Sequence, residues 1–280
     1  MESNKVINAL KKCIGQRTCG IIAQGKSINE LELRMNEFKD YDICWMGIGQ
    51  FDTVEKYIME PNDKSLDLVF DSSSIPESRI PAYEKEQRIP RLEYFLSKNS
   101  DKLWIMSHGI YRDAIQRLKL WEFWSKYENQ AIWVDHLFPR DEIATYMDVP
   151  NTLTLATAVA IAGGAKKIIL FGCDGYTGPV NTGEGILTYY KPEEVKKERL
   201  LALGSIEDPG INRDTGAFQK RFRECYMRFA NLFNNCPDVY NCSPITLYNH
   251  IRKINYDECK LILEGGSLEP ERGEGWHLIF

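Results

Sequence analysis

Short apolar runs alternate with amphipathic stretches along this chain, and no segment repeats another. The apolar runs predict strands at 18–23, 42–46, 66–70, 102–106, 131–134, 167–171 and 239–240. Between them, apolar residues at helical spacing predict helices at 4–14, 28–38, 152–162, 192–202 and 214–233, with another helix, rich in tryptophan, after the fourth strand. Such alternation is typical of a parallel sheet with helical crossovers. We therefore expect an α/β fold with a doubly wound, mostly parallel sheet and helices on both faces.

The length of 280 residues suits a single α/β domain with a sizeable core. We expect this domain to span residues 1–265 and to be followed by a C-terminal tail over 266–280. Within it, the stretches at about 75–150 and 177–212 are interpreted as insertions or lid segments. The second stretch begins with a glycine-rich loop whose length is typical of a lid or a binding loop.

The charge balance is mildly acidic, because 35 Lys and Arg stand against 40 Asp and Glu, for a formal net charge of −5. Such a chain has no overall positive field, so we expect no nucleic acid partner. The cysteines include no C-x-x-C pair, which argues against a zinc site. Several lie in apolar runs, as reduced, buried thiols do, so we expect a reducing compartment. The sequence has no apolar run of membrane-spanning length and no signal-peptide pattern, so we expect a cytoplasmic protein without a transmembrane segment.

Small or polar residues follow nearly every predicted strand. Gly47 and Gly49 follow the second strand, His108 the fourth, His136 the fifth and Asp174 the sixth. In open α/β sheets, ligands bind outside the carboxyl ends of the strands, near the point where the strand order reverses. These residues are therefore candidates for a binding site. The alternative is that they only supply the chemistry of ordinary turns.

The segment from Gly20 to Ser27 matches the P-loop pattern G-x-x-x-x-G-K-[ST] letter for letter. In a P-loop the first glycine ends a strand, but here residues 20–23 are themselves the most strand-like of the region, which disfavours that assignment. A shorter interpretation fits better: Gln24-Gly25-Lys26-Ser27 turns the chain into a helix whose first N–H groups form an anion site. Ser27 and Glu30 predict a capping box there. An ordinary strand-to-helix turn with a serine cap is the alternative.

Three stretches together resemble a known group of proteins. They are Ile21 to Ser27, Tyr41 to Cys44, and the long run from Asn151 to Tyr176, which ends in the pattern G-x-K-x-I-x-L-x-G-x-D-x-Y. The stretch from Asn241 to Leu247 is similar to the closing motif of the same group. With these motifs the chain resembles the superfamily that joins bacterial CMP-sialic acid sialyltransferases of the Campylobacter type with archaeal hydroxymethylpterin diphosphokinase-like proteins. The similarity covers residues 18–50 and 150–250.

The resemblance implies a Rossmann-like sheet that binds a nucleotide. It places Gln24 and Ser27 in the first turn and Thr152 at the start of the late helix. It also places Tyr176 near the phosphate, with either Tyr189 or Tyr190 as a second tyrosine there. The expected nucleotide-binding residues are Gln24, Gly25, Lys26, Ser27, Gly47, Gly49, Asn151, Thr152, Gly175, Tyr176 and Tyr189. The chain departs from the sialyltransferases at two points. Glycine replaces the asparagine that ends their second strand, and residues 191–235 contain no histidine where those enzymes carry the catalytic one.

Transfer of a sugar to a hydroxyl needs a general base near the acceptor and stabilisation of the departing phosphate. The candidates for catalysis are Asp174, His136 and His108, because all three follow predicted strands. Asp174 has two other roles open to it: it could hold a metal with the nucleotide, or it could stabilise the turn at the end of its strand. Either histidine could instead be structural.

We therefore expect a sialyltransferase-like glycosyltransferase of surface polysaccharide biosynthesis. It would move a sugar from a nucleotide-activated donor, with CMP as the nucleotide that the resemblance implies, to a glycan hydroxyl, without a required cofactor. One alternative is a diphosphokinase-like enzyme that uses ATP and Mg²⁺, and another is a nucleotide-binding protein without catalysis. The expected partners are the nucleotide-sugar donor and the glycan acceptor, and homo-oligomerisation is left open.

Overall fold

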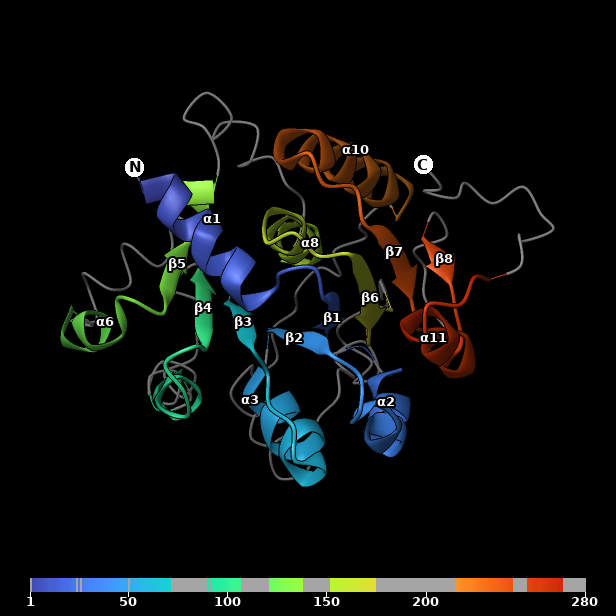
Figure 1. Cartoon of the computed structure of the whole chain (residues 1–280), viewed down its shortest axis with the longest axis horizontal. Coiled ribbons are helices and arrows are strands. Elements are labelled where there is room, and N and C mark those ends of the chain that lie inside the picture. The colour runs from blue at the N-terminus through green and yellow to red at the C-terminus, as the bar shows by residue number, and fades with distance from the viewer. Residues whose placement is uncertain are drawn as a thin grey trace, which may run out of the picture.

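A single sheet of eight parallel strands organises the computed structural model of this chain (Figure 1). The structure describes residues 2–23, 25, 27–49, 51–71, 90, 92–106, 121–137, 152–174, 215–243 and 251–268. The strands are β1 (Thr18–Ile22), β2 (Ile43–Ile48), β3 (Leu68–Asp71), β4 (Leu103–Met106), β5 (Ala131–Trp133), β6 (Lys167–Phe171), β7 (Asp238–Asn241) and β8 (Arg252–Lys253). Every strand pairs with its neighbours in parallel.

The strand order across the sheet is β5-β4-β3-β2-β1-β6-β7-β8. From β1 the chain winds outward through β2, β3 and β4 to β5 at one edge. It then returns to β6, on the other side of β1, and continues to β7 and β8. At the end of β1, Ile22 lies opposite Gly47 of β2 and Phe171 of β6. β1 thus has β2 on one side and β6 on the other. The chain builds the sheet outward from β1 in one direction and then, from β6, in the other direction, which confirms the predicted doubly wound sheet.

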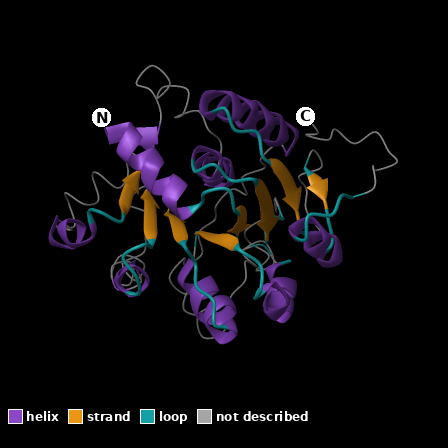
Figure 2. Ribbon diagram, in the orientation of Figure 1, coloured by secondary structure: helices purple, strands orange, loops and turns teal. Residues whose placement is uncertain are grey.

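Helices cover both faces of the sheet (Figures 1 and 2). One face carries α1 (Glu2–Cys13), α8 (Thr152–Ala162) and α10 (Thr215–Phe233). The other face carries α2 (Ile28–Arg34), α3 (Phe51–Val54), the π-helical turn η2 (Glu55–Met59) and α11 (Tyr256–Leu263). Each layer of helices encloses its own hydrophobic cluster against the sheet.

Burial on both faces explains why the strands are continuous apolar runs instead of alternating ones. In β2, Cys44 and Met46 belong to the cluster under α8, whereas Ile43 and Trp45 belong to the cluster under α2. Such runs are the strongest strand signal in the sequence. For the same reason α8, which lies between the sheet and α10, is apolar all round, and each of its residues after Thr152 is buried.

Three helices end in the same way, with a residue in the left-handed conformation directly after the C-cap. These residues are Gly164 after α8 (φ 79°), Asn234 after α10 (φ 48°) and Gly265 after α11 (φ 85°). In each case the next N–H bonds back to the carbonyl five positions earlier, as Gly266 N does to Leu261 O at 2.8 Å. This is the Schellman arrangement, which satisfies carbonyls that the helix end leaves free.

The predicted strands are all present, with bounds that differ by up to two residues. The predicted end of the second strand is wrong, because β2 continues through Gly47 to Ile48. The helix predicted at 28–38 is α2 followed by a 3₁₀ turn, η1 (Met35–Phe38). The sequence pattern did not predict α3, η2, the 3₁₀ turn η3 (Glu60–Asn62), β8, α11 or the helical residues 92–97.

The stretch from 75 to 150 contributes β4 and β5 to the sheet, together with α6 (Trp121–Tyr127), which is part of the predicted tryptophan-rich helix, and the 3₁₀ turn η5 (Val134–Leu137). The predicted helix at 192–202, the glycine-rich loop at 177–190 and most of the tail lie outside the described residues. The division into one domain with insertions stays a prediction.

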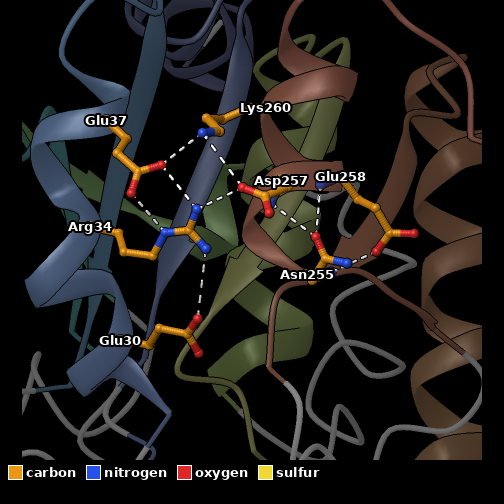
Figure 3. A network of polar contacts seen from close by, with 7 residues as sticks. All are labelled: Glu30, Arg34, Glu37, Asn255, Asp257, Glu258 and Lys260. Carbon is orange, nitrogen blue, oxygen red and sulfur yellow. Dashed lines mark hydrogen bonds and ion pairs between the residues drawn. The ribbon is translucent and has the colours of Figure 1, made fainter.

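An exposed network of ion pairs joins α2 to α11 (Figure 3). The Arg34 guanidinium contacts the carboxylates of Asp257 at 2.7 Å and Glu37 at 2.8 Å, and the Lys260 ammonium contacts Glu37 at 2.8 Å. The Arg34 guanidinium also lies over the ring of Tyr256, 5.1 Å from its centroid, which is cation–π geometry. The network therefore links the C-terminal end of α2 to α11.

Candidate functional site

The carboxyl ends of β1 and β6 lie side by side where the strand order reverses. The chain that leaves β1 stays bound to the end of β6: Ala23 N donates to Phe171 O at 2.8 Å, and Gly25 N donates to Gly172 O at 2.7 Å. We call the connection from β1 to α2 the first turn; Ala23, Gly25 and Ser27 are its described residues. This is the place where a doubly wound sheet binds its ligands.

Asp174 joins the loops that follow three different strands. Its side chain is only 4% exposed. Its Oδ2 accepts a hydrogen bond from Ser27 N at 3.0 Å, and its Oδ1 accepts from the hydroxyls of Ser27 and of Ser243, the latter at 2.5 Å. Asp174 follows β6, Ser27 follows β1 and Ser243 follows β7. These three residues, which we call the Asp174 clamp, hold the loops together around a carboxylate that would otherwise be costly to bury.

Two glycines let these loops approach each other closely. A Cβ at Gly25 would lie 2.5 Å from Asp174 Oδ2 and 2.5 Å from Gly172 O. Gly172 has a φ of 63°, and a Cβ there would lie 2.5 Å from Ala23 O. The end of β6 and the first turn are therefore packed backbone against backbone, with no space for a side chain at either position.

The contacts of Ser27 overturn one expectation about the first turn. Ser27 occupies the N-cap position of α2 with helical angles (φ −63°, ψ −13°), and its hydroxyl makes no capping bond. The predicted capping box of Ser27 and Glu30 is therefore wrong, because that hydroxyl is bound to Asp174. Residues 20–22 lie within β1, which excludes a P-loop at this segment, as the strand-like sequence indicates.

The N–H groups that the structure describes at the start of α2 are also engaged within the chain. Gly25 N donates to Gly172 O, Ser27 N donates to Asp174 Oδ2, and Ile28 N donates to Gly25 O at 3.0 Å. These three donors therefore do not form the anion site that the sequence suggested at the start of α2.

Asn241 and Ser243 are the residues of this edge that the site prediction omits. Asn241 is fully buried at the end of β7, and its Nδ2 donates to Cys173 O at 3.1 Å. Ser243 completes the Asp174 clamp. Two sequence features could have identified both residues. They are polar residues directly after a short apolar strand, Val239-Tyr240, as Asp174 is after its own strand. They also lie in the stretch that resembles the closing motif of the superfamily.

The predicted glycines near β2 have different surroundings. Gly47 lies within the strand, where a Cβ would be 2.6 Å from Leu66 Cδ1 and 3.0 Å from Phe51 Cβ. Packing by these two side chains accounts for glycine at this position. Gly49 follows the strand with a φ of 76°, a conformation that favours glycine, so it forms the sharp turn at the carboxyl edge.

Thr152 lies toward the same edge of the sheet. Lys166 follows α8, and its N–H donates to the carbonyl of Arg17, which lies just before β1. The end of α8 is therefore near the amino ends of the strands. The helix of 11 residues is about 16 Å long, close to the length of the strands. Its first residue, Thr152, is therefore near the carboxyl ends of the central strands.

His136 lies apart from this cluster. It belongs to η5, directly after β5, which is four strands from β1. At the usual spacing between strands this is about 19 Å. The other predicted site residues lie outside the described residues: Gln24, Lys26, His108, Asn151, Gly175, Tyr176 and Tyr189.

The thiol of Cys173 belongs to the residue directly before Asp174 in the sequence. Burial, and secondly the charge of Asp174, raise the pKa of this thiol well above its ordinary value. It therefore stays protonated at neutral pH and does not provide a thiolate nucleophile.

Within the described ranges, no three His, Cys, Asp or Glu residues are grouped so that they could hold a metal ion. In the same part of the chain, none of the helices combines the length and the apolar character needed to cross a bilayer.

No family model matches the sequence, and no curated protein matches it. Among solved structures, a mutant of the alpha-2,3/8-sialyltransferase CstII aligns with a TM-score of 0.47 and 17% sequence identity, over 92% of this chain and 93% of that chain. At that identity and score, the likeness says nothing about what this chain binds or catalyses.

Proposed function

We propose that this chain binds a nucleotide at the carboxyl edge of the sheet, between β1 and β6, and transfers a sugar from a nucleotide-activated donor to a glycan hydroxyl. The observation that carries the proposal is the reversal of strand order at β1 and β6, where three strand-end loops converge on Asp174. A doubly wound sheet opens a crevice for a ligand at such a point.

The start of α8 supports a phosphate-bearing ligand at this edge. α8 has no acidic residue in its first turn, and its N-terminal end carries the positive end of the helix dipole. Thr152 adds a hydroxyl there. Asn151, Tyr176 and Tyr189 remain proposed phosphate and nucleotide contacts on the strength of the sequence motifs alone.

Glycosyl transfer is preferred over a P-loop kinase reaction because the segment that matches the P-loop pattern is part of strand β1. In this proposal Asp174 is a positioning residue, since its two oxygens already accept from three donors. The general base would then come from another residue, with His108 as the remaining histidine candidate. CMP is the proposed donor nucleotide, and the glycan acceptor is proposed only as a class.

A thermal-shift panel of CMP, CDP, UDP, GDP and ATP, each with and without Mg²⁺, tests the proposal. A ligand at 100 times its Kd stabilises the folded state by about 2.7 kcal/mol, which gives a readily measured shift in Tm. Stabilisation by CMP without metal is the expected result. A shift that needs ATP and Mg²⁺ together would favour the diphosphokinase alternative, and no shift with any nucleotide would contradict the nucleotide site.

The position of the site can be tested with two threonines at opposite edges of the sheet. Thr152→Ala removes a hydroxyl at the proposed site, so we expect nucleotide affinity to fall about fivefold, the usual effect of one hydrogen bond. Thr18→Ala, at the amino end of β1, is the matched control and should leave affinity unchanged. Equal effects of the two changes would argue against a site at the carboxyl edge.

A further inference from the structure

The first turn has the sequence of a phosphate-binding turn, yet the donors that the structure describes at Gly25 and Ser27 are used within the chain. A phosphate at such a turn is held by backbone N–H groups and a serine hydroxyl. Here the N–H of Gly25 goes to Gly172 O, and both the N–H and the hydroxyl of Ser27 go to Asp174. The carboxylate of Asp174 thus takes the position that a bound anion would occupy.

The packing around Gly25 closes the same position to a second anion. A single added carbon at Gly25 would lie 2.5 Å from Asp174 Cγ and 2.5 Å from Asp174 Oδ2. Ser243 approaches Asp174 Oδ1 from the loop after β7. The carboxylate is therefore enclosed by three loops, and the 4% of its residue that remains exposed leaves no room for a phosphate among its donors.

We propose that Asp174 occupies the anion position of the first turn and thereby fixes which part of the nucleotide lies there, an inference that rests on the proposed function. Because its carboxylate fills the anion position of the first turn, the uncharged nucleoside part of the ligand lies against this turn and the phosphate is held elsewhere. A phosphate placed about 4 Å from this carboxylate would lose about a thousandfold in affinity at an effective dielectric constant of about 20.

The test compares ligands that differ only in one phosphate. The dissociation constants of cytidine and CMP are measured by calorimetry for the wild type, for Asp174→Asn, which removes the charge, and for Ser243→Ala, which removes one donor and keeps the charge. If the phosphate lies more than a Debye length from Asp174, the ratio of the two constants in Asp174→Asn should stay within about twofold of the wild-type ratio. A tenfold or larger rise in the preference for CMP in Asp174→Asn, and not in Ser243→Ala, would overturn the inference.

A measurement on the wild type covers the case in which Asp174→Asn fails to fold. The amide NMR signals of Gly25 and Ser27 are followed during titration with inorganic phosphate, and they should not move. A saturable shift of the Ser27 amide would place an anion in the first turn and overturn the inference. If neither cytidine nor any nucleotide binds the wild type, the proposed function is wrong, and the role of Asp174 is wrong with it. If a nucleotide binds with its phosphate at the Asp174 clamp, only the role of Asp174 is wrong.

Discussion

Replacing Gly172 with alanine tests whether the end of β6 is locked against the first turn. Gly172 has a φ of 63°, and an L-residue in the left-handed region costs about 1–2 kcal/mol. The added Cβ would also lie 2.5 Å from Ala23 O and 3.1 Å from Ile28 Cβ. Ala23 cannot simply move away, because its N–H is bonded to Phe171 O.

The magnitude follows from adding these two effects. Overpacking against a fixed neighbour costs about 1–3 kcal/mol, so Gly172→Ala should lower the free energy of unfolding by about 2–5 kcal/mol. The matched control is Gly265→Ala at the end of α11. Gly265 has a φ of 85°, and a Cβ there would meet nothing within 4 Å. It should therefore cost only the conformational part, about 1–2 kcal/mol.

Urea denaturation of the wild type and both variants gives the comparison, from the midpoints at an unchanged m-value. The expected result is that Gly172→Ala is destabilised by at least about 1 kcal/mol more than Gly265→Ala. If the two variants lose the same stability, the end of β6 can retreat from the first turn, and the close packing described above is not rigid.

Two further changes probe the ion pairs of the fold. Arg34→Gln should cost about 1 kcal/mol or less at low salt, because its partners are largely exposed. Hydrogen bonds from Arg34, and then from Lys260, lower the pKa of Glu37 from its ordinary 4.5 to about 2, so this contribution is present above pH 4.5 and is lost as the pH falls toward 2. The difference in urea midpoint between wild type and Arg34→Gln should shrink over that range, and a constant difference would contradict the assignment. Glu55→Gln should cost about 2–3 kcal/mol, because the buried Glu55 carboxylate accepts from Leu66 N, Ser65 Oγ and Lys98 Nζ. Glu60→Gln, which removes a more exposed partner of Lys98, is the control and should cost less than about 1 kcal/mol.

The strands could be predicted because the sheet is buried on both faces. Each run in the sequence is continuous, since successive residues such as Ile168 and Ile169 enter opposite hydrophobic clusters. β8 gave no such signal, because it has two polar residues, Arg252 and Lys253, at the edge of the sheet. The order of the strands was predictable only as a class, from the alternation of strands and helices.

Local capping signals were a weaker guide, as two segments with the same pattern show. Ser27 and Glu30 have the spacing of a capping box, yet the Ser27 hydroxyl binds Asp174, which is 147 residues away in the sequence. Asn255 and Glu258 have the same spacing and do form the box: the Asn255 side chain accepts from Glu258 N at 2.9 Å, and Glu258 Oε2 accepts from Asn255 N at 2.8 Å. A local sequence pattern cannot show that a residue distant in the sequence, such as Asp174, will bind the capping side chain. Only the fold decides whether a capping box forms.

The P-loop match illustrates the same limit at the site itself. Its first glycine, Gly20, lies in β1 under the indole of Trp45, where a Cβ would be 2.7 Å from the ring. Its second glycine, Gly25, is required by the carboxylate of Asp174. Both glycines thus have a packing reason that involves a side chain from another strand or loop, and neither needs a phosphate. The P-loop pattern is thus satisfied by two separate packing constraints of the sheet. Together they form a closed junction between the ends of β1 and β6, held by the carboxylate of Asp174.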